Sequence, residues 1–450
     1  MMLEEIKNLL ADGDIDTVAI CFPDMAGRLM GKREGAKYFL GAAGEGSHMC
    51  DYLFTVDVEG NPIPGFQSAS WEKGYGDFVV KPDIRTWRNM PWLSGQAIVI
   101  GDCILPDGAL VPTAPRAMLK KQIQKAAELG FSFNFASELE FYLYEDSYDG
   151  CIAKDFKGLT PSSPYSQDYN LLRTTAVEPL LAELRAALDA MGIEVETTKG
   201  EWGPGQQEIS LRYADPLTNA DNHVYYKQAV KEIAAKHQKS ATFMAKPSSD
   251  IAGSSCHIHA SLWSVDGSRS RSVDPSSPDG LSKEFKHFMA GVMAHAAEIT
   301  LFFAPNINSY KRFQSGSFAP TRICWGRDNR TTAFRLVGHG KSTRMEVRIP
   351  GADANVHTAF AAIIAAGLKG IADELQMPDE TNGNAYADPS LHEIPKSLNE
   401  AIARAHGSAM LRQAFGNVVV DHYVHAAKWE VYQYDGFVTD WEKRRLFERI

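Results

Sequence analysis

Charged side chains stand at alternate positions in three stretches of sequence that otherwise look like buried strands. The stretches are SELEF at 137–141, CHIHA at 256–260 and RMEVRIP at 344–350. Successive side chains of a strand point to opposite faces, so this spacing gathers the charged groups of each strand on one face. A fourth stretch, GEWGPGQQEIS at 200–210, places two glutamates on either side of a Gly-Pro-Gly turn that folds the chain back on itself. These glutamates would repel each other unless a cation lies between them.

Two interpretations of these stretches compete. An alternating-charge strand is usually a solvated face, and a single histidine is more often a satisfied core residue than a ligand. Here, however, EFYLY and VRIP continue into apolar sequence, and a buried carboxylate must be paired or bind a metal. Carboxylate-rich sites without thiolates suit Mg²⁺ or Mn²⁺ rather than structural zinc. We therefore expect two or three such ions, held by one converging set: Glu138, Glu140, Glu201, Glu208, Glu346, His257 and His259.

Basic residues crowd into fewer than forty positions of the C-terminal half, in a chain that is acidic as a whole. They are Arg312, Arg322, Arg327, Arg330, Arg335, Arg344 and Arg348, with Lys311 and Lys341. Guanidinium groups bind carboxylates and phosphates through two parallel hydrogen bonds. Hard metals beside such a cluster predict phosphoryl transfer. The sequence contains neither a GxxxxGK[ST] phosphate loop nor a GxGxxG dinucleotide motif, which excludes the two common nucleotide folds.

Composition and charge exclude several other classes of protein. The chain of 450 residues has a formal net charge of −10, which argues against a nucleic-acid surface. It has no run of 18 apolar residues, and its N-terminus is too charged for the apolar part of a signal peptide, so we expect a cytoplasmic protein that binds no membrane. The six cysteines lack CxxC spacing, which predicts reduced, partly buried thiols.

The order of predicted elements indicates an α+β chain with two domains. Short apolar runs with glycine and proline predict a small, mostly β module over the first hundred residues. A turn-rich segment at 105–115 then leads into an amphipathic helix, and we place the boundary there, dividing the chain into 1–108 and 109–450. Beyond it we expect strands at 131–145, 208–213 and 254–263, helices at 177–192 and 221–238, a serine-rich loop at 265–280 and a mostly helical C-terminal third.

A series of motifs, spread over most of the chain, resembles those of the glutamine synthetase family in sequence and in order. They are GRLMGK, SELEF, EWGPGQQE, FMAKP followed by GSSCHIHASL, NSYKRF, GSFAP, WGRDNR, RMEVRIPGADAN and VTDWEKRRLFERI. The resemblance implies an N-terminal β-grasp domain and a catalytic domain built on a curved antiparallel sheet with surrounding helices. It also implies a homo-oligomer, a dodecamer of two stacked hexameric rings with active sites between neighbouring subunits.

The resemblance further implies a role for each matching residue. One metal would be held by Glu140, Glu201 and Glu208, and a second by Glu138, His257 and Glu346. The ATP site would comprise Glu196, Tyr213, His259, Ser261, Lys341 and Arg344. Arg330 and Arg335 would lie at the transferred phosphate, and Arg312, Arg348 and the backbone of Gly253 would bind L-glutamate. ATP would phosphorylate the γ-carboxylate, and an amine would then displace phosphate to give a γ-glutamyl amide.

Three departures from the family pattern point away from ammonia as the amine. Phe318 stands where ammonia-using members carry a glutamate that helps to hold ammonium, and a phenyl ring offers only a weak cation–π contact. Ala252 replaces the asparagine that usually precedes the substrate-loop glycine, and the FDGSS pattern that completes the ammonium site is missing.

His392 replaces a tyrosine that some bacterial members adenylylate, so regulation by adenylylation is not expected.

These departures predict an ATP-dependent ligase that joins glutamate to an organic monoamine, an alkylamine or arylamine. Phe318 then shapes the amine pocket, unless it merely packs within its loop. Three alternatives stay open: a glutamine synthetase that tolerates Phe318, a polyamine ligase, and a catalytically silent relative. A polyamine ligase would need an acidic patch at the pocket mouth, and the sequence cannot place Asp51, Asp57 or Glu59 there.

Overall fold

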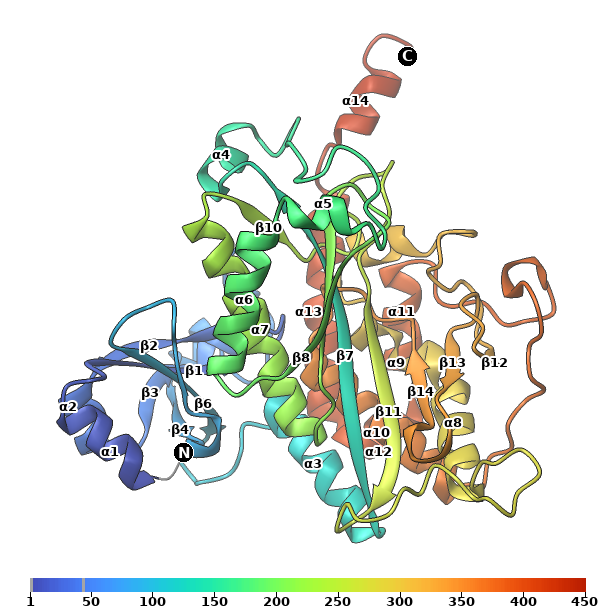
Figure 1. Ribbon diagram of the computed structural model, residues 1–450, viewed down its shortest axis with the longest axis horizontal. Helices are drawn as coiled ribbons and strands as arrows, with labels where there is room; N and C mark the ends of the chain where they lie inside the picture. The colour runs from blue at the N-terminus through green and yellow to red at the C-terminus, as the bar shows by residue number, and fades with distance from the viewer. Residues whose placement is uncertain (1–2, 43–44) are drawn as a thin grey trace.

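A mixed six-stranded sheet forms the N-terminal part of the protein (Figure 1). The computed structural model describes residues 3–42 and 45–450. The strand order is β2-β1-β6-β4-β3, with β5 also paired to β6; β1 and β6 run parallel and the other pairs are antiparallel. The elements are α1 (Leu3–Ala11), β1 (Thr17–Pro23), β2 (Leu29–Gly35), α2 (Ala36–Ala42), β3 (Ser47–Cys50), β4 (Asp77–Pro82), β5 (Arg88–Asn89) and β6 (Gln96–Ile104).

Alternation along β6 explains how this sheet is held between two cores. Ala97 and Val99 pack with apolar residues of α1 and α2 on one face, whereas Ile98 and Ile100 join the large core of the following domain on the other. Both faces of the sheet are therefore covered, and β6 reads as the near-continuous apolar run AIVI. The sequence predicted the β character of this part but not its two helices.

An eight-stranded sheet forms the centre of the second part, in the order β12-β13-β14-β11-β7-β9-β8, with β10 paired to β7. All its pairs are antiparallel except β12 with β13. The expected strands and the serine-rich turns at 265–280 are confirmed. The strands are β7 (Phe131–Tyr144), β8 (Val195–Gly200), β9 (Gln206–Leu211), β10 (Ser240–Thr242), β11 (Cys256–Ser264), β12 (Trp325–Arg327), β13 (Phe334–Val337) and β14 (Arg344–Val347).

Helices cover one face of this sheet and leave the other to polar side chains. The apolar face packs on α3 (Pro115–Glu128), α7 (Pro216–Lys236), α8 (Lys283–Ala294) and α10 (Val356–Ala372). The C-terminal third is helical, as predicted, and α14 projects from the body of the protein (Figure 1). The remaining helices are α4 (Tyr148–Ala153), α5 (Leu171–Thr175), α6 (Glu178–Ala190), α9 (Ala296–Phe303), α11 (Leu398–His406), α12 (Ala409–Phe415), α13 (Asn417–Asp435) and α14 (Asp440–Leu446).

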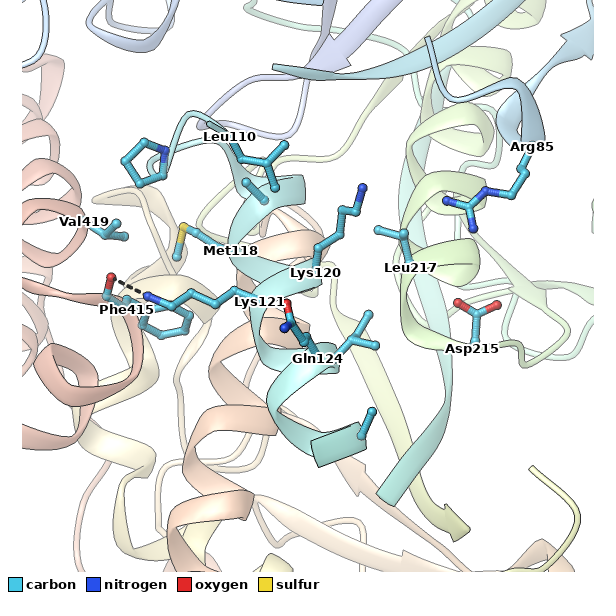
Figure 2. A pocket seen from close by; sticks show the side chains of 14 residues that line it. Arg85, Leu110, Met118, Lys120, Lys121, Gln124, Asp215, Leu217, Phe415 and Val419 are labelled. Carbon is cyan, nitrogen blue, oxygen red and sulfur yellow. Dashed lines mark hydrogen bonds between the residues drawn. The ribbon is translucent and has the colours of Figure 1, made fainter. Parts of the chain in front are cut away.

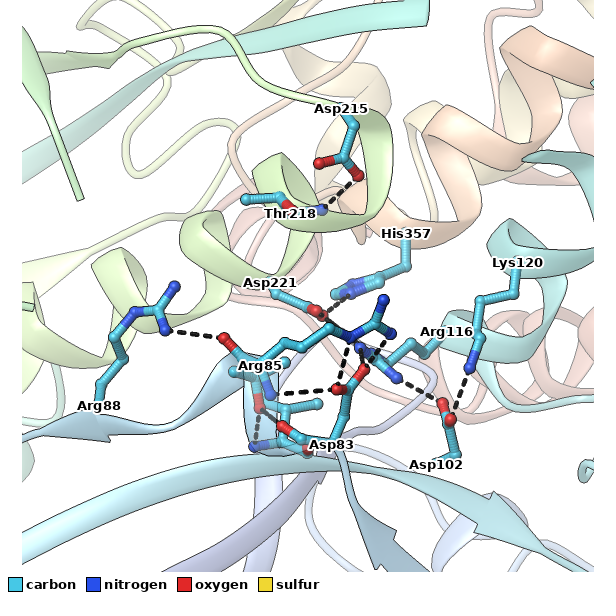
Figure 3. A network of polar contacts seen from close by, with 12 residues as sticks. Asp83, Arg85, Arg88, Asp102, Arg116, Lys120, Asp215, Thr218, Asp221 and His357 are labelled. Carbon is cyan, nitrogen blue, oxygen red and sulfur yellow. Dashed lines mark hydrogen bonds and ion pairs between the residues drawn. The ribbon is translucent and has the colours of Figure 1, made fainter. Parts of the chain in front are cut away.

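A buried ion network joins the two parts of the chain (Figure 3). Arg116 on α3 donates to Asp83 after β4 at 2.7 Å, to Asp102 on β6 at 2.5 Å and to Asp221 on α7 at 3.0 Å. His357 on α10 contacts the same Asp221 at 2.9 Å. The Arg116 side chain is 3% exposed, so its charge is compensated by protein groups rather than by water.

A groove of about 630 Å³ runs beside α3, lined by Met118, Lys121, Leu217, Phe415 and Val419 among others (Figure 2). Because α3 packs on the apolar face of the eight-stranded sheet, this groove lies away from the polar face. The six cysteines are free. Within residues 3–42 and 45–450, no helix combines the length and the apolar character that crossing a membrane requires.

Candidate active site

Strand register brings the charged residues of distant motifs onto the polar face of the eight-stranded sheet. The alternate residues Leu139, Ile209, Ile258 and Met345 point into the core, which fixes the orientation of their charged neighbours. Directly opposed residues of neighbouring strands lie close enough to interact. The opposed pairs are Glu138 with His257, Glu140 with Glu208, His259 with Glu346, and Glu346 with Arg335.

Three carboxylates, Glu140, Glu201 and Glu208, form the first group on this face. They offer oxygen atoms that all lie within 4.8 Å of one another. Glu140 accepts hydrogen bonds from the Ser255 amide at 2.8 Å and from Gln206 Nε2 at 2.9 Å. Burial, with the charge of Glu201, raises the pKa of Glu140 to about 7, and burial with the neighbouring carboxylates raises the pKa of Glu208 well above its usual value. Ionisation of all three carboxylates is therefore unfavourable unless a cation joins them, and the group fits a divalent cation.

Lys199, at the end of β8, lies against this group. Its Nζ pairs with Glu201 and stands 4.0 Å from Glu208. The same Nζ is 3.9 Å from Asp168 and 4.6 Å from the centre of the Tyr169 ring. Lys199 and Glu201 are themselves two positions apart, so the spacing that revealed the other residues was present here and was overlooked.

The second group combines two carboxylates with two imidazoles. Glu138 lies 3.0 Å from His259 Nε2 and 3.5 Å from His257 Nδ1, and His257 Nδ1 is 3.4 Å from Glu346. Burial opposes ionisation of both carboxylates, but the histidines hold the pKa of Glu138 below its usual value. His257 and Arg348 lower the pKa of Glu346 to about 2. Burial and the charge of Arg348 lower the pKa of His257 to about 4, so it is neutral and able to act as a ligand.

Ligand-capable atoms of this group cluster in two ways. Glu138 lies with His259 and Glu346 in one cluster, and with Glu208 and His257 in another. The assignment that places Glu138, His257 and Glu346 at one metal stays a prediction. The short distances of His257 to both glutamates agree with it.

Arginines close the second group on the side of β13 and β14. Arg335 donates to Glu346 at 2.8 Å and to Asp328 at 3.0 Å. Arg348 donates to Glu346 at 2.5 Å and to the carbonyl of Phe318 at 3.2 Å. Arg344 donates to His259 Nδ1 at 3.1 Å. Three guanidinium groups thus converge on the strand face that carries the carboxylates.

Arg312 is buried beside this face and is held by backbone carbonyls of Arg348 and Ile349 at 2.9 and 2.8 Å. Gly253 lies directly against it: a Cβ at this position would come within 2.7 Å of Arg312 Cγ and of the Ala245 carbonyl. The glycine is needed because the chain passes too close to Arg312 for any side chain.

Several residues predicted to bind the nucleotide lie at exposed positions and take no part in the ion pairs described above. Glu196 is exposed on β8, the edge strand, and Tyr213 follows β9. Arg330 is exposed in the turn before β13, and Lys341 is exposed in the short 3-10 helix after it. Ser261 is buried on β11, where its hydroxyl accepts a hydrogen bond from Trp263 at 2.9 Å. The structure does not bring the first four into contact with the carboxylates, and their roles stay predictions.

Phe318 stands at the tip of a loop in a left-handed conformation, with φ of 59° and 56% of its surface exposed. Arg348 holds the carbonyl of Phe318, and the hydroxyl of Tyr386 donates to the carbonyl of Ala319 at 2.9 Å. Burial raises the pKa of Tyr386, against the opposing charges of Arg348 and Arg312. The exposed Phe318 ring is therefore carried by a loop that is anchored to the site.

Five residues of the site were not identified from the sequence: Lys199, Gln206, Ser255, Asp328 and Tyr386. Gln206 and Ser255 lie inside quoted motifs, where their hydrogen bonds to Glu140 follow from the fold alone. Tyr386 lies nearly seventy positions from its hydrogen-bond partner Ala319, and no local pattern links the two.

Five carboxylates, two imidazoles and three guanidinium groups on one face of an antiparallel sheet define a class of site, one that binds divalent cations and anionic substrates for phosphoryl transfer. The chain belongs to the glutamine synthetase family. Its residues 112–446 match the model of the glutamine synthetase catalytic domain.

Relatives span nearly the whole chain. The protein is 45% identical to γ-glutamylethanolamide synthetase GlnA4 of Streptomyces coelicolor, covering 100% of this chain and 96% of the relative. It is 37% identical to a glutamate–isopropylamine ligase of a Pseudomonas species, over 99% and 98% of the two chains. A solved structure of apo GmaS without ligand superposes with a TM-score of 0.87 at 26% identity, covering 98% and 99% of the two chains.

Proposed function

We propose that the protein is an ATP-dependent ligase that joins the γ-carboxylate of L-glutamate to a small organic amine through a γ-glutamyl phosphate. The observation that carries the choice of amine is Phe318, an exposed aromatic ring on a loop held by Arg348, at the position where ammonia-using relatives carry a carboxylate. The relatives named for ethanolamide and isopropylamine products support this choice.

Two or three divalent cations, Mg²⁺ or Mn²⁺, would be held by the two carboxylate groups. Glu140, Glu201 and Glu208 fit one ion because burial and mutual repulsion raise the pKa of two of them. Glu138, His257 and Glu346 would hold another. When bound, such ions neutralise the charge that develops on the transferred phosphoryl group.

Side chains around the carboxylates would bind the two anionic substrates. Glu196, Tyr213, His259, Ser261, Lys341 and Arg344 would contact ATP, whose terminal phosphate would lie at Arg330 and Arg335. Arg312 and Arg348, with the backbone of Gly253, would hold glutamate so that its γ-carboxylate faces that phosphate. Bound in this way, the two substrates need little further ordering to reach an in-line geometry.

The second step replaces phosphate by the amine. The amine nitrogen, in its neutral form, forms the new C–N bond at the acyl carbon; the C–O bond to phosphate breaks and a proton leaves the nitrogen. Phe318 would accept an apolar substituent of the amine in a pocket that offers no carboxylate for ammonium at this position.

The assembly and location follow the family pattern in this proposal. The protein would form a cytoplasmic dodecamer of two stacked hexameric rings with active sites between subunits. The boundary between the β-grasp domain, 1–108, and the catalytic domain, 109–450, is part of the same proposal. Sedimentation of the purified protein tests the dodecamer. Limited proteolysis tests the domain boundary.

Phosphate release tests the proposed reaction. The assay contains ATP, glutamate, Mg²⁺ or Mn²⁺, and one amine from a panel of ammonium, ethanolamine, isopropylamine, aniline and putrescine. We expect one of the monoamines to give the highest kcat/KM, and mass spectrometry to identify its γ-glutamyl amide. Highest activity with ammonium would identify a glutamine synthetase, highest activity with putrescine a polyamine ligase, and no metal-dependent activity a silent relative.

A further inference from the structure

Lys199 places an ammonium group against the carboxylates of a candidate metal site. Its Nζ is in ion-pair contact with Glu201 and lies 4.0 Å from Glu208, and both of these residues belong to the group that includes Glu140. The side chain is 21% exposed, so the ammonium group is partly removed from water. A cation in this position relieves the same repulsion that a divalent ion would relieve.

The pairing of β8 with β9 sets the direction in which the Lys199 side chain points. It extends from β8, whose pairing with β9 sets Lys199 directly opposite Glu208. Opposite charges in directly opposed strand positions attract each other, so the fold itself directs the lysine toward the group. Arg312, whose charge acts on Glu140, is oriented by the carbonyls of Arg348 and Ile349 and cannot take this position.

We propose that Lys199 is an internal counter-ion that offsets part of the negative charge of the Glu140, Glu201 and Glu208 group in the ion-free protein and is displaced when a divalent cation binds there. This inference rests on the proposed metal site but not on the identity of the amine. Lys199 then sets the affinity of that site, because each binding event must first separate it from Glu201.

A second resting place for Lys199 lies within reach. Asp168 is 3.9 Å from its Nζ, and the Nζ lies over the Tyr169 ring, 4.6 Å from the ring centre. A carboxylate and an aromatic face both attract an ammonium group. After a divalent cation has displaced it, the Lys199 ammonium group can therefore interact with Asp168 and Tyr169. Its charge does not move into apolar surroundings.

Mn²⁺ titration of chelator-treated protein, followed by the electron paramagnetic resonance signal of the free ion, tests the proposal without any substrate. We expect Lys199→Met to bind one Mn²⁺ about tenfold more tightly than wild type, since the competing charge is gone. Lys199→Arg should stay within about twofold of wild type because it keeps the charge.

Lys239→Met is the matched control. Lys239 is 20% exposed and pairs with Glu145, outside the candidate metal groups, so its replacement should leave Mn²⁺ affinity unchanged. Unchanged or weaker binding by Lys199→Met would overturn the inference while leaving the proposed function intact. Failure of wild type itself to bind Mn²⁺ would instead contradict the metal site in the proposed function.

Thermal unfolding provides the second readout. Without ions, Lys199→Met should unfold several degrees below wild type, and saturating Mn²⁺ should close that gap. A gap that persists in Mn²⁺ would show a merely structural role and overturn the proposal. If ion-free Lys199→Met does not fold, the double variant Lys199→Met, Glu201→Gln replaces it, because it removes one charge of each sign. We expect the double variant to fold. Its failure to fold would show that charge imbalance is not the cause and would overturn the proposal.

Discussion

Two buried clusters of carboxylates in this protein behave in opposite ways. Three aspartates, Asp83 after β4, Asp102 on β6 and Asp221 on α7, pair with three cations, Arg85, Arg116 and Lys120, so the charges balance (Figure 3). On the polar face of the large sheet, Glu201 and Glu208 share one described ion-pair partner, Lys199, and the neighbouring Glu140 has no ion pair among the described residues. Burial is common to both clusters, and the number of cations differs.

The pKa values follow this difference. Burial opposes ionisation of Asp221 as it does that of Glu140 and Glu208, but Arg116 reverses the effect and holds the pKa of Asp221 below its usual value. Arg85 and Arg116 likewise lower the pKa of Asp83. In the other cluster the pKa of Glu140 reaches about 7. A balanced cluster stabilises the fold, whereas an unbalanced one leaves charge that a ligand can neutralise.

Removing the central cation of the balanced cluster should have the largest effect. Arg116→Met leaves three aspartates without their common partner, and we expect it to lower the free energy of unfolding by about 3–5 kcal/mol. Urea denaturation at neutral pH measures this loss. Arg85→Met, at a position 77% exposed, is the control and should cost less than about 1 kcal/mol. A small effect of Arg116→Met would show that the cluster contributes little.

Removing a carboxylate from the unbalanced cluster should have the opposite effect on stability. Glu208→Gln should raise the unfolding midpoint of the ion-free protein, because one repelling charge is lost. Amine-dependent phosphate release should fall by at least about a hundredfold, since a metal ligand is lost. Glu194→Gln, at an exposed position before β8, is the control for both measurements. A lower midpoint for Glu208→Gln would contradict the repulsion inferred here.

A carboxylate introduced at Phe318 should change the choice of amine. Phe318→Glu adds a negative charge next to the loop held by Arg348, and we expect the kcat/KM ratio of ammonium to the preferred monoamine to rise about tenfold to a hundredfold. Phe156→Glu is a matched control, because Phe156 is also exposed and has φ of 54°. Unchanged selectivity in Phe318→Glu would show that the amine pocket lies elsewhere.

The smallest expected effect is a pH dependence that differs between the clusters. Asp83 and Asp221 have lowered pKa values, so the stability they contribute is present above the unfolded value of about 4 and is lost as pH falls. Glu140 has a raised pKa, so the ion-free protein should lose stability as pH rises toward about 7. Thermal scans with chelator and with Mn²⁺ should show this second loss only in chelator. The same loss in Mn²⁺ would assign it to another group.

Particular residues show how far the sequence could lead. The i, i+2 spacing in SELEF, CHIHA and RMEVRIP predicted which side chains share a face, because strand alternation is a local property. The same spacing in KGE, 199–201, was present but was not used. Asp328 and Tyr386 had no such signal, since they reach Arg335 and the Phe318 loop from positions outside the strands.

By itself, the sequence determined the strand faces, the helical C-terminal third and the membership of the glutamine synthetase family, because periodicity and ordered motifs are properties of neighbouring residues. The balance of charge was decided only by the tertiary structure. Arg116 meets aspartates that lie 14, 33 and 105 positions away, whereas within the described part of the chain the ion pairs of the Glu140 group are those with Lys199. Coulomb energy depends on distance in space and on burial, and neither can be obtained from the order of residues along the chain.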